Sequence, residues 1–361
     1  MNAPVKRIAI LTSGGDCAGL NAILRAVVLR ASALNWEVIG IKNGTHGLLC
    51  DPPKTQVLTV EDVETAILRQ GGTILGTTNK GDPFAYPMPD GSLKDRSGEI
   101  IAALKKLGCE AVIGIGGDGS LAILQRLARQ GGFHLIGIPK TIDNDLSMTE
   151  TSVGFDTAVA VATEALDRLQ PTAASHDRIM ILEVMGRDAG HIALTAGIAG
   201  GADVILIPEI PYTLQKVAAH IESLRQRGRN FALMVVSEAV KTSAGETLTK
   251  AFYGNQHRLG GIGHYLGAQI ADLCQAETRV TVLGHVQRGG QPSAQDRLLA
   301  TAFGVHAVEL IQAGHYDRMV GWSNRTVIDV PIDDAIRQCQ QVGPEDSLVR
   351  TARGLGVCLG D

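Results

Sequence analysis

The chain has 361 residues, of which 45% are hydrophobic, 19% charged and 4% aromatic, and its formal net charge is −4. This length predicts about two domains with a sizeable core, and the composition excludes a disordered chain and a basic protein that binds nucleic acid. The six cysteines form no CxxC pairs and no long apolar segment is present, so we expect a cytoplasmic protein without disulfides, zinc or membrane association.

Short aliphatic runs, each followed by Gly, Pro or Asp and then by a helical pattern, recur along the chain. They predict an α/β fold, with mainly parallel strands that are buried on both faces and linked by helices. One helix should begin near Leu20, and another should follow the glycine loop that ends at Ser120. The expected strands are 8–11, 38–41, 112–115, 135–138, 179–184, 204–207, 232–236 and 280–283.

Two further patterns concern the organisation of the chain. Residues 13–22 resemble residues 185–193, and each segment directly follows a predicted strand. The similarity indicates two related α/β halves, with chance likeness between Gly-rich turns as the alternative. The longest irregular stretch, 78–95, is typical of an elaborated surface loop, and its place after a Gly-rich run favours a role in covering a ligand.

Parallel sheets bind ligands beyond the carboxyl ends of their strands, so the residues after each run are the first candidates for function. Gly14 and Gly15 follow the first run, where two glycines allow backbone N–H groups to approach a phosphate. The run is neither a Walker A loop nor a GxGxxG turn. A tight connection between a strand and a helix is the alternative.

A second glycine-rich turn, Gly117-Asp118-Gly119-Ser120, also separates a strand from a helix. Its glycines leave space for a polyphosphate, the start of the helix favours negative charge, and Asp118 is suited to hold a magnesium ion. The alternative is that Asp118 and Ser120 cap the helix. Two such turns in one chain favour the phosphate interpretation.

The segment that follows Lys140 carries Thr141, Asp143 and Asp145. Phosphoryl transfer to an alcohol needs a carboxylate that accepts the hydroxyl proton, a second carboxylate near the metal, and a donor to the transferred group. These three residues can supply all three groups. A polar Asn/Asp turn without function is the alternative.

Arginines near the ends of strands point to a phosphorylated substrate, because a guanidinium group binds phosphate through two hydrogen bonds. The candidates are Arg178, Arg187, Arg279 and Arg288, each of which could also form a surface ion pair. Glu238 could accept hydrogen bonds from sugar hydroxyls or cap a turn.

These motifs, in this order and over residues 8 to about 314, resemble the 6-phosphofructokinase family. The resemblance is carried by the two glycine turns together with residues 141–145, 185–187 and 285–290. It implies a glycolytic kinase that transfers the γ-phosphoryl group of ATP to the 1-hydroxyl of fructose 6-phosphate, with Mg²⁺ as cofactor. It also implies two similar three-layer α/β domains with the active site in the cleft between them.

The resemblance assigns a role to each candidate residue. The implied catalytic residues are Asp143, Thr141, Arg187 and Asp145, with Asp143 as the general base. The nucleotide would be bound by Gly14, Gly15, Asn79, Lys80, Gly117, Asp118, Gly119 and Ser120, with Asp118 as the magnesium ligand. Fructose 6-phosphate would be bound by Thr141, Ile142, Asp143, Arg178, Met185, Gly186, Arg187, Glu238, Arg279, His285, Val286, Gln287 and Arg288.

The family also implies a division of the chain and an assembly. The nucleotide-binding domain would comprise 1–150 plus about 260–310, and the sugar-phosphate domain about 151–259 plus 311–361. We expect a homo-oligomer, namely a tetramer that could be arranged as a dimer of dimers, with sites shared between subunits. Arg178 and Arg279 would reach the site of a neighbouring subunit.

Departures from the bacterial pattern bear on the phosphoryl donor and on regulation. Lys140 is shared with pyrophosphate-dependent members, whereas Gly119 leaves the space of an α-phosphate open and favours ATP over pyrophosphate. Asn79 replaces a nucleotide-binding arginine, whose contact is expected to pass to Lys80. Arg25, Arg227 and Arg229 keep basic character at the family's effector site, but Leu29 and Gln170 replace arginines, so we expect altered allosteric behaviour.

Two alternatives from other classes are weaker. A non-catalytic sugar-phosphate or nucleotide sensor would be expected to lack Asp143 or Asp118, and both are present. A Rossmann dehydrogenase would need a GxGxxG turn with an acidic residue about 20 positions later. Residues 114–119 have this glycine spacing, but residues 137–141 include no acidic residue.

Overall fold

Strands form at all eight runs where the sequence predicts them. In a computed structural model that describes residues 6–79, 81–252 and 256–361, these strands are β1 (Arg7–Thr12), β2 (Glu37–Ile41), β6 (Ala111–Gly116), β7 (His134–Pro139), β8 (Ile179–Val184), β9 (Val204–Leu206), β10 (Ala232–Ser237) and β13 (Thr278–Val282). β6, β8 and β10 are buried along their whole length, as expected of strands covered on both faces.

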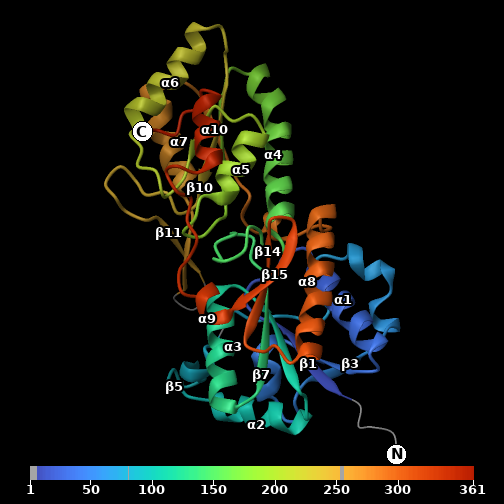
Figure 1. The fold of residues 1–361 in the computed structure, drawn as a ribbon. Coiled ribbons are helices and arrows are strands. Elements are labelled where there is room, and N and C mark those ends of the chain that lie inside the picture. The colour runs from blue at the N-terminus through green and yellow to red at the C-terminus, as the bar shows by residue number, and fades with distance from the viewer. Residues whose placement is uncertain (1–5, 80, 253–255) are drawn as a thin grey trace, which may run out of the picture. The chain divides into compact units, whose positions relative to one another are not determined.

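Helices separate most of these strands (Figure 1). They are α1 (Leu20–Ala33), α2 (Ser97–Leu107), α3 (Asp118–Gly131), α4 (Phe155–Ser175), α5 (His191–Ala199), α6 (Leu214–Gln226), α7 (Ile262–Cys274), α8 (Ala294–Ala313), α9 (Ile332–Ala335) and α10 (Ser347–Gly354). α3 shows why they form where they do: Leu121, Leu124 and Leu127 recur at helical spacing and are buried, and Gly132 ends the helix with a φ of +66°.

Among the described residues, seven strands were not anticipated, and all of them except β14, which lies between β7 and β15, are short or at a sheet edge. Within an edge strand, apolar residues alternate with polar ones, so the strand lacks the continuous aliphatic run that marks a central strand. They are β3 (Thr55–Leu58), β4 (Tyr86–Pro87), β5 (Leu93–Lys94), β11 (Thr249–Phe252), β12 (Gln256–Leu259), β14 (Arg318–Ser323) and β15 (Thr326–Pro331). The 3₁₀ turns are η1 (Gly44–Leu49), η2 (Glu61–Val63), η3 (Thr65–Arg69), η4 (Pro83–Ala85) and η5 (Gly284–Arg288).

The chain divides into two units. The first comprises residues 1–141, 146–156 and 288–339, and the second comprises 142–145, 157–287 and 340–361. The first contains a seven-stranded sheet of order β15-β14-β7-β6-β1-β2-β3, in which β3 and β15 are antiparallel to their neighbours. The second contains the parallel sheet β13-β8-β10-β9. The predicted α/β class with mainly parallel sheets is confirmed.

These units do not follow the predicted domain boundaries. Residues 260–287 fall in the second unit because β13 pairs with β8. Residues 311–339 fall in the first because β14 pairs with β7. Which substrate each domain binds stays a prediction.

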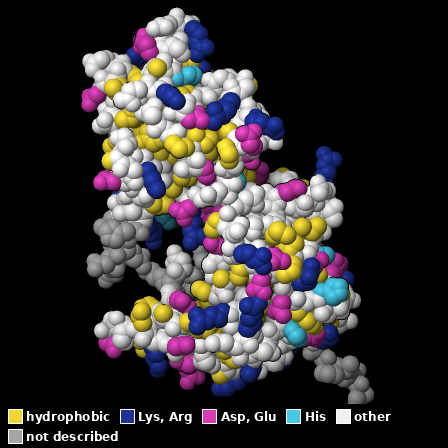
Figure 2. Space-filling view, turned by 60° about the vertical axis from the view of Figure 1, so that its left-hand side comes forward, with side chains coloured by type: hydrophobic (Ala, Val, Ile, Leu, Met, Phe, Trp, Pro, Cys, Tyr) yellow, Lys and Arg dark blue, Asp and Glu magenta, His cyan; other side chains and the backbone are white. Residues whose placement is uncertain are grey.

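Other expectations concern the surface and the loops. No helix in the described part of the chain is both long and apolar enough to span a membrane. On the face shown in Figure 2, Lys and Arg side chains are interspersed with Asp and Glu. The stretch 78–95 contains η4 and the two-residue strands β4 and β5 within irregular chain, and its role over a ligand stays a prediction. The six cysteines are free thiols.

Candidate active site

The glycine turn after β1 meets the start of α3 and Lys140. Gly14 has a φ of +83°, a conformation that favours glycine. A Cβ atom on Gly14 would lie 3.0 Å from Oγ of Ser120 and 3.5 Å from Nζ of Lys140. Both glycine-rich motifs of the sequence therefore adjoin one place in the first unit, together with a buried cation.

Arg288 lies against the same turn. Its Nη1 donates to the carbonyl oxygen of Asp16 at 3.0 Å, and a Cβ on Gly15 would approach this nitrogen to 2.6 Å. Lys140 donates to the carbonyl oxygen of Gly15. Two cations and the partly buried backbone of a glycine turn are suited to a phosphate group.

The start of α3 leaves open space. The N-cap residue of α3 is Gly117, and no side-chain hydrogen bond caps the helix. Asp118 is the first residue of the helix and is therefore not its cap. A Cβ on Gly119 would meet nothing within 4 Å, and one on Gly117 would meet nothing closer than 3.6 Å. A carboxylate in an uncrowded turn fits the oxygen ligands that Mg²⁺ prefers.

Residues 77–79 lie beside the glycine turn. The N–H of Gly14 donates to the carbonyl oxygen of Thr78 at 2.9 Å, and Oγ1 of Thr77 donates to the carbonyl oxygen of Gly14 at 2.7 Å. Asn79 is therefore close to the predicted nucleotide residues. Lys80 lies outside the described residues.

The acidic segment after β7 belongs largely to the second unit. Asp143 and Asp145 are 7% and 4% exposed, and Nη1 of Arg187 is 3.9 Å from Oδ2 of Asp145. Ile142 is 1% exposed, so its side chain serves the core, and any contact with substrate would come from its backbone. Thr141 ends the first of the three segments of the first unit, and its carbonyl oxygen accepts a hydrogen bond from Ser152 at 2.7 Å.

The turn Met185-Gly186-Arg187 is tightly held after β8. The N–H of Met185 donates to Oε1 of Gln287 at 2.7 Å. Gly186 has a φ of +157°, and a Cβ there would lie 2.6 Å from the carbonyl oxygen of Ala189. Gln287 is 1% exposed, so it holds this turn from the buried side. His285 and Val286, by contrast, are exposed.

Glu238 completes the group in the second unit. The N–H of Arg187 donates to its Oε1 at 3.3 Å. Burial, reinforced by the negative charge of Asp143, raises the pKa of Glu238 to about 7. Three carboxyl groups and one guanidinium group thus form a cluster of ionisable side chains at close range, as is common at functional sites. They belong to Asp143, Asp145, Glu238 and Arg187.

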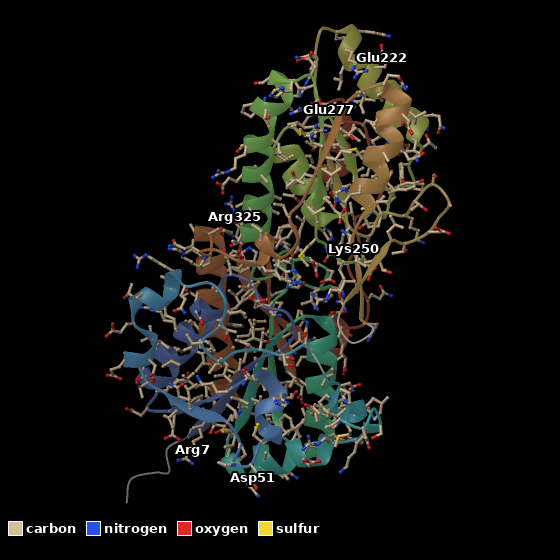
Figure 3. All side chains as sticks on the ribbon, turned by 180° about the vertical axis from the view of Figure 1, so that it is seen from behind. Arg7, Asp51, Glu222, Lys250, Glu277 and Arg325 are labelled. Atoms are coloured by element: carbon tan, nitrogen blue, oxygen red, sulfur yellow. The ribbon has the colours of Figure 1, made fainter. Side chains whose placement is uncertain are left out.

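Arg178 and Arg279 are not part of this cluster. They lie at the amino ends of β8 and β13, whereas Met185 and His285 follow the carboxyl ends of these strands. Glu277, labelled in Figure 3, pairs with both arginines, and its carboxylate is 2.7 Å from Nε of Arg178. Their predicted role in another subunit's site stays a prediction.

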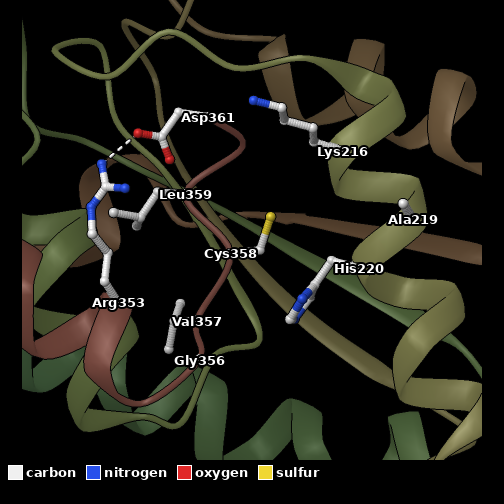
Figure 4. Close-up of a pocket in the computed structure, with 9 residues that line it drawn as sticks. All are labelled: Lys216, Ala219, His220, Arg353, Gly356, Val357, Cys358, Leu359 and Asp361. Carbon is white, nitrogen blue, oxygen red and sulfur yellow. Dashed lines mark hydrogen bonds and ion pairs between the residues drawn. The ribbon is translucent and has the colours of Figure 1, made fainter.

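A separate pocket of about 370 Å³ lies between α6 and the C-terminal residues of the second unit (Figure 4). It is lined by Lys216, Ala219, His220, Arg353, Gly356, Val357, Cys358, Leu359 and Asp361. None of the predicted site residues lines it.

One neighbour of the site was missed by the sequence analysis. The thiol of Cys339 donates to Oδ2 of Asp118 at 3.6 Å, and the two residues are 221 positions apart. No local pattern around Cys339 signals this contact, because it depends on the antiparallel bridge between Leu146 and Cys339.

Comparison with known sequences identifies the family to which the chain is similar. The sequence profile of the family described as Phosphofructokinase matches residues 7–311. The chain is 63% identical over 356 residues to a Nostoc sp. protein named ATP-dependent 6-phosphofructokinase 1, with 99% of each chain covered. It is 48% identical over 361 residues to the ATP-dependent 6-phosphofructokinase of Chloroflexus aurantiacus, covering 100% of this chain and 99% of that protein.

Solved structures share the fold. Pichia pastoris phosphofructokinase in the T-state matches with a TM-score of 0.80 and 28% identity over 93% of this chain, which spans 36% of the length of the Pichia chain. The pyrophosphate-dependent phosphofructokinase from Marinobacter aquaeolei matches with a TM-score of 0.76 and 22% identity, covering 99% of this chain and 93% of that one. At 22% identity the likeness concerns the fold alone.

Proposed function

The chain belongs to the phosphofructokinase family, and from this premise we propose that it is a glycolytic kinase that phosphorylates the 1-hydroxyl of fructose 6-phosphate with ATP. The products are fructose 1,6-bisphosphate and ADP. The observation that carries the proposal is the meeting of Gly14, Ser120 and Lys140 at one glycine-lined place. Such a place suits the phosphates of a nucleotide.

ATP is the favoured donor. Position 119 is a glycine with open space around it, whereas a carboxylate there would repel an α-phosphate. The relatives that are 48% and 63% identical carry ATP in their names. Lys140 alone would suit a pyrophosphate oxygen equally well, but here it already donates to Gly15.

Asp143 is proposed as the general base that removes the proton of the 1-hydroxyl. Thr141 and Arg187 would stabilise the transferred phosphoryl group, and Asp145 would keep Arg187 in place through the 3.9 Å ion pair. Asp118 would hold Mg²⁺, which neutralises phosphate charge when it is bound.

The remaining residues are proposed to bind the two substrates. The nucleotide phosphates would contact Gly14, Gly15 and the turn 117–120, with Asn79 and Lys80 nearby. The sugar phosphate would contact Met185, Gly186, Glu238, His285, Val286 and Arg288, with Ile142 contributing its backbone and Gln287 supporting the turn. Arg178 and Arg279 would serve a neighbouring subunit of a homo-oligomer, for which we propose a tetramer.

Location and regulation follow the same proposal. A glycolytic enzyme with six free thiols suits the cytoplasm. At the proposed effector site Arg229 pairs with Asp203 at 2.9 Å, so part of its charge is already neutralised. We therefore expect weak activation by ADP, and strong stimulation in an ADP titration would contradict this expectation.

The test is an assay of fructose 1,6-bisphosphate formation from fructose 6-phosphate. Purified protein is supplied with Mg²⁺ and either ATP or pyrophosphate at equal concentration. The proposal predicts rapid product formation with ATP and at most trace formation with pyrophosphate. The reverse preference would assign the chain to the pyrophosphate-dependent type, and no product with either donor would favour a sensor.

A further inference from the structure

Asn21 lies in the first turn of α1 and is fully buried, with 0% of its surface exposed. All three hydrogen bonds of its side chain go to one segment, residues 70–74. Its Nδ2 donates to the carbonyl oxygens of Gln70 and Gly71 at 3.1 and 3.3 Å, and its Oδ1 accepts from the N–H of Ile74 at 2.9 Å. The side chain thus attaches a loop to a helix.

The same loop leads to the predicted nucleotide residues. Oγ1 of Thr12 donates to the carbonyl oxygen of Gly76 at 2.7 Å. Immediately afterwards, Thr77 and Thr78 exchange hydrogen bonds with Gly14 at 2.7 and 2.9 Å. The segment 70–78 is therefore attached at one end to α1 through Asn21 and at the other to the glycine turn.

The path of the segment leaves little room for adjustment. A Cβ on Gly71 would lie 2.2 Å from the carbonyl oxygen of Gly290, so the two backbones are in close contact. A loop confined in this way at Gly71 and bonded at Ile74 delivers residues 77–79 to a defined position.

We infer that Asn21 is a positioning residue of the nucleotide site: it holds residues 70–74 so that residues 77–79 lie beside Gly14. The inference rests on the proposed function, because it takes the Gly14 turn as the place where the nucleotide phosphates bind. Asn21 acts through the loop and does not touch the nucleotide, since its side chain is buried and its three bonds are with the loop.

The chemistry of the side chain explains why an asparagine is needed. The loop presents two carbonyl oxygens and one N–H group to α1, and a primary amide supplies two donors and one acceptor. Aspartate has the same shape but no donor when it is ionised, and it would face two carbonyl oxygens. Alanine would leave the carbonyl oxygens of Gln70 and Gly71 and the N–H of Ile74 without their partner.

The experiment compares Asn21→Asp and Asn21→Ala with the control Val28→Ala. Val28 is on the same helix and 1% exposed, so its truncation destabilises α1 without removing a bond to the loop. For both Asn21 variants we expect the KM for ATP to rise about tenfold, the effect of one or two buried hydrogen bonds. The KM for fructose 6-phosphate should stay within about twofold, and Val28→Ala should change neither KM.

A second readout does not depend on catalysis. Amide hydrogen exchange at Ile74 should be faster in Asn21→Ala, which removes the acceptor of this N–H group, than in the wild type and in Val28→Ala. If the wild type does not phosphorylate fructose 6-phosphate, the proposed function fails, and this exchange measurement still tests the positioning. If Asn21→Asp does not fold, Asn21→Ala carries the same comparison.

The inference is overturned by either of two results. One is an active wild type whose Asn21 variants show the same KM for ATP as Val28→Ala. The other is an exchange rate at Ile74 that is unchanged by Asn21→Ala.

Discussion

The backbone N–H of Arg187 donates to a side-chain oxygen of Glu238 at 3.3 Å, so the arginine turn and the end of β10 are joined through a carboxyl group. Burial raises the pKa of that carboxyl group from an ordinary value of 4.5 to about 7, and the nearby charge of Asp143 adds to the shift. Near neutral pH, Glu238 therefore changes its charge within the candidate site.

This raised pKa predicts a pH-dependent stability difference between the wild type and Glu238→Gln. Between about pH 4.5 and 7 the folded wild type keeps a proton that the unfolded chain has released, so its free energy of unfolding falls as pH rises through this window. Glutamine does not titrate. The variant should gain stability relative to the wild type up to about pH 7, by about 1–3 kcal/mol, and no further above it.

Urea unfolding of both proteins at a series of pH values measures this difference. Glu222→Gln is the control, because Glu222 is an exposed glutamate on α6. A stability difference that is the same at all pH values would contradict the raised pKa of Glu238.

Asp143 is proposed to accept the proton of the sugar hydroxyl, a contribution that is made mainly in the transition state. Asp143→Asn should lower kcat by about 10²–10⁴-fold and leave the KM for fructose 6-phosphate within about threefold. Steady-state kinetics with ATP test this, with Asp167→Asn on the exposed surface of α4 as the control. A kcat close to that of the wild type would remove Asp143 from the mechanism.

Gly119 and Gly98 offer a matched pair for the choice of donor. Each is the second residue of its helix, α3 or α2, and a Cβ on either would meet nothing within 4 Å. Gly119→Asp should raise the KM for ATP about tenfold or more through charge repulsion, while Gly98→Asp should leave it unchanged. Equal values of KM for the two variants would show that position 119 does not face the nucleotide.

The turn of the β14–β15 hairpin carries strain that glycine would relieve. Asn324 and Arg325 both have positive φ, +49° and +64°, as in a type I′ turn that favours Asn-Gly. The left-handed conformation costs Arg325 about 1–2 kcal/mol, and the greater chain entropy of glycine costs about 0.5–1 kcal/mol.

Arg325→Gly should therefore raise the free energy of unfolding by about 1 kcal/mol. Arg325 is exposed at the tip of the hairpin (Figure 3). Arg325→Ala should give no such gain, because alanine keeps the Cβ atom. Urea midpoints of the three proteins measure the effect, and a glycine variant no more stable than the alanine variant would disprove the strain.

The central strands and the residues that follow them were predictable, because continuous aliphatic runs mark strands buried on both faces. Strand-end geometry then explains why Gly14 and Ser120 converge. The hairpin of β14 and β15 was missed because its turn is Asn-Arg and lacks the Asn-Gly signal of a two-residue hairpin. In addition, β15 is partly exposed and has no continuous aliphatic run. The two units depart from the predicted division of the chain at this hairpin, because β14 pairs with β7 and brings residues 318–323 to the first sheet.

Contacts between distant segments limited the prediction of the site. The sequence motif 141–145 gives no sign that the side chain of Ile142 is buried, because the residues around it are functional candidates. The contact of Cys339 with Asp118 and the bonds of Asn21 to residues 70–74 depend on the folded path of the chain. Asn21 offered a weak signal, as a polar residue on the otherwise apolar first turn of α1.

The most direct test of the account is ³¹P NMR of a mixture of the protein, Mg²⁺, ATP and fructose 6-phosphate. The account predicts that the γ-phosphate signal of ATP disappears while ADP and a new phosphate on carbon 1 of the sugar appear in equal amounts. Intact ATP beside unchanged fructose 6-phosphate, or a phosphate on any other hydroxyl, would contradict it.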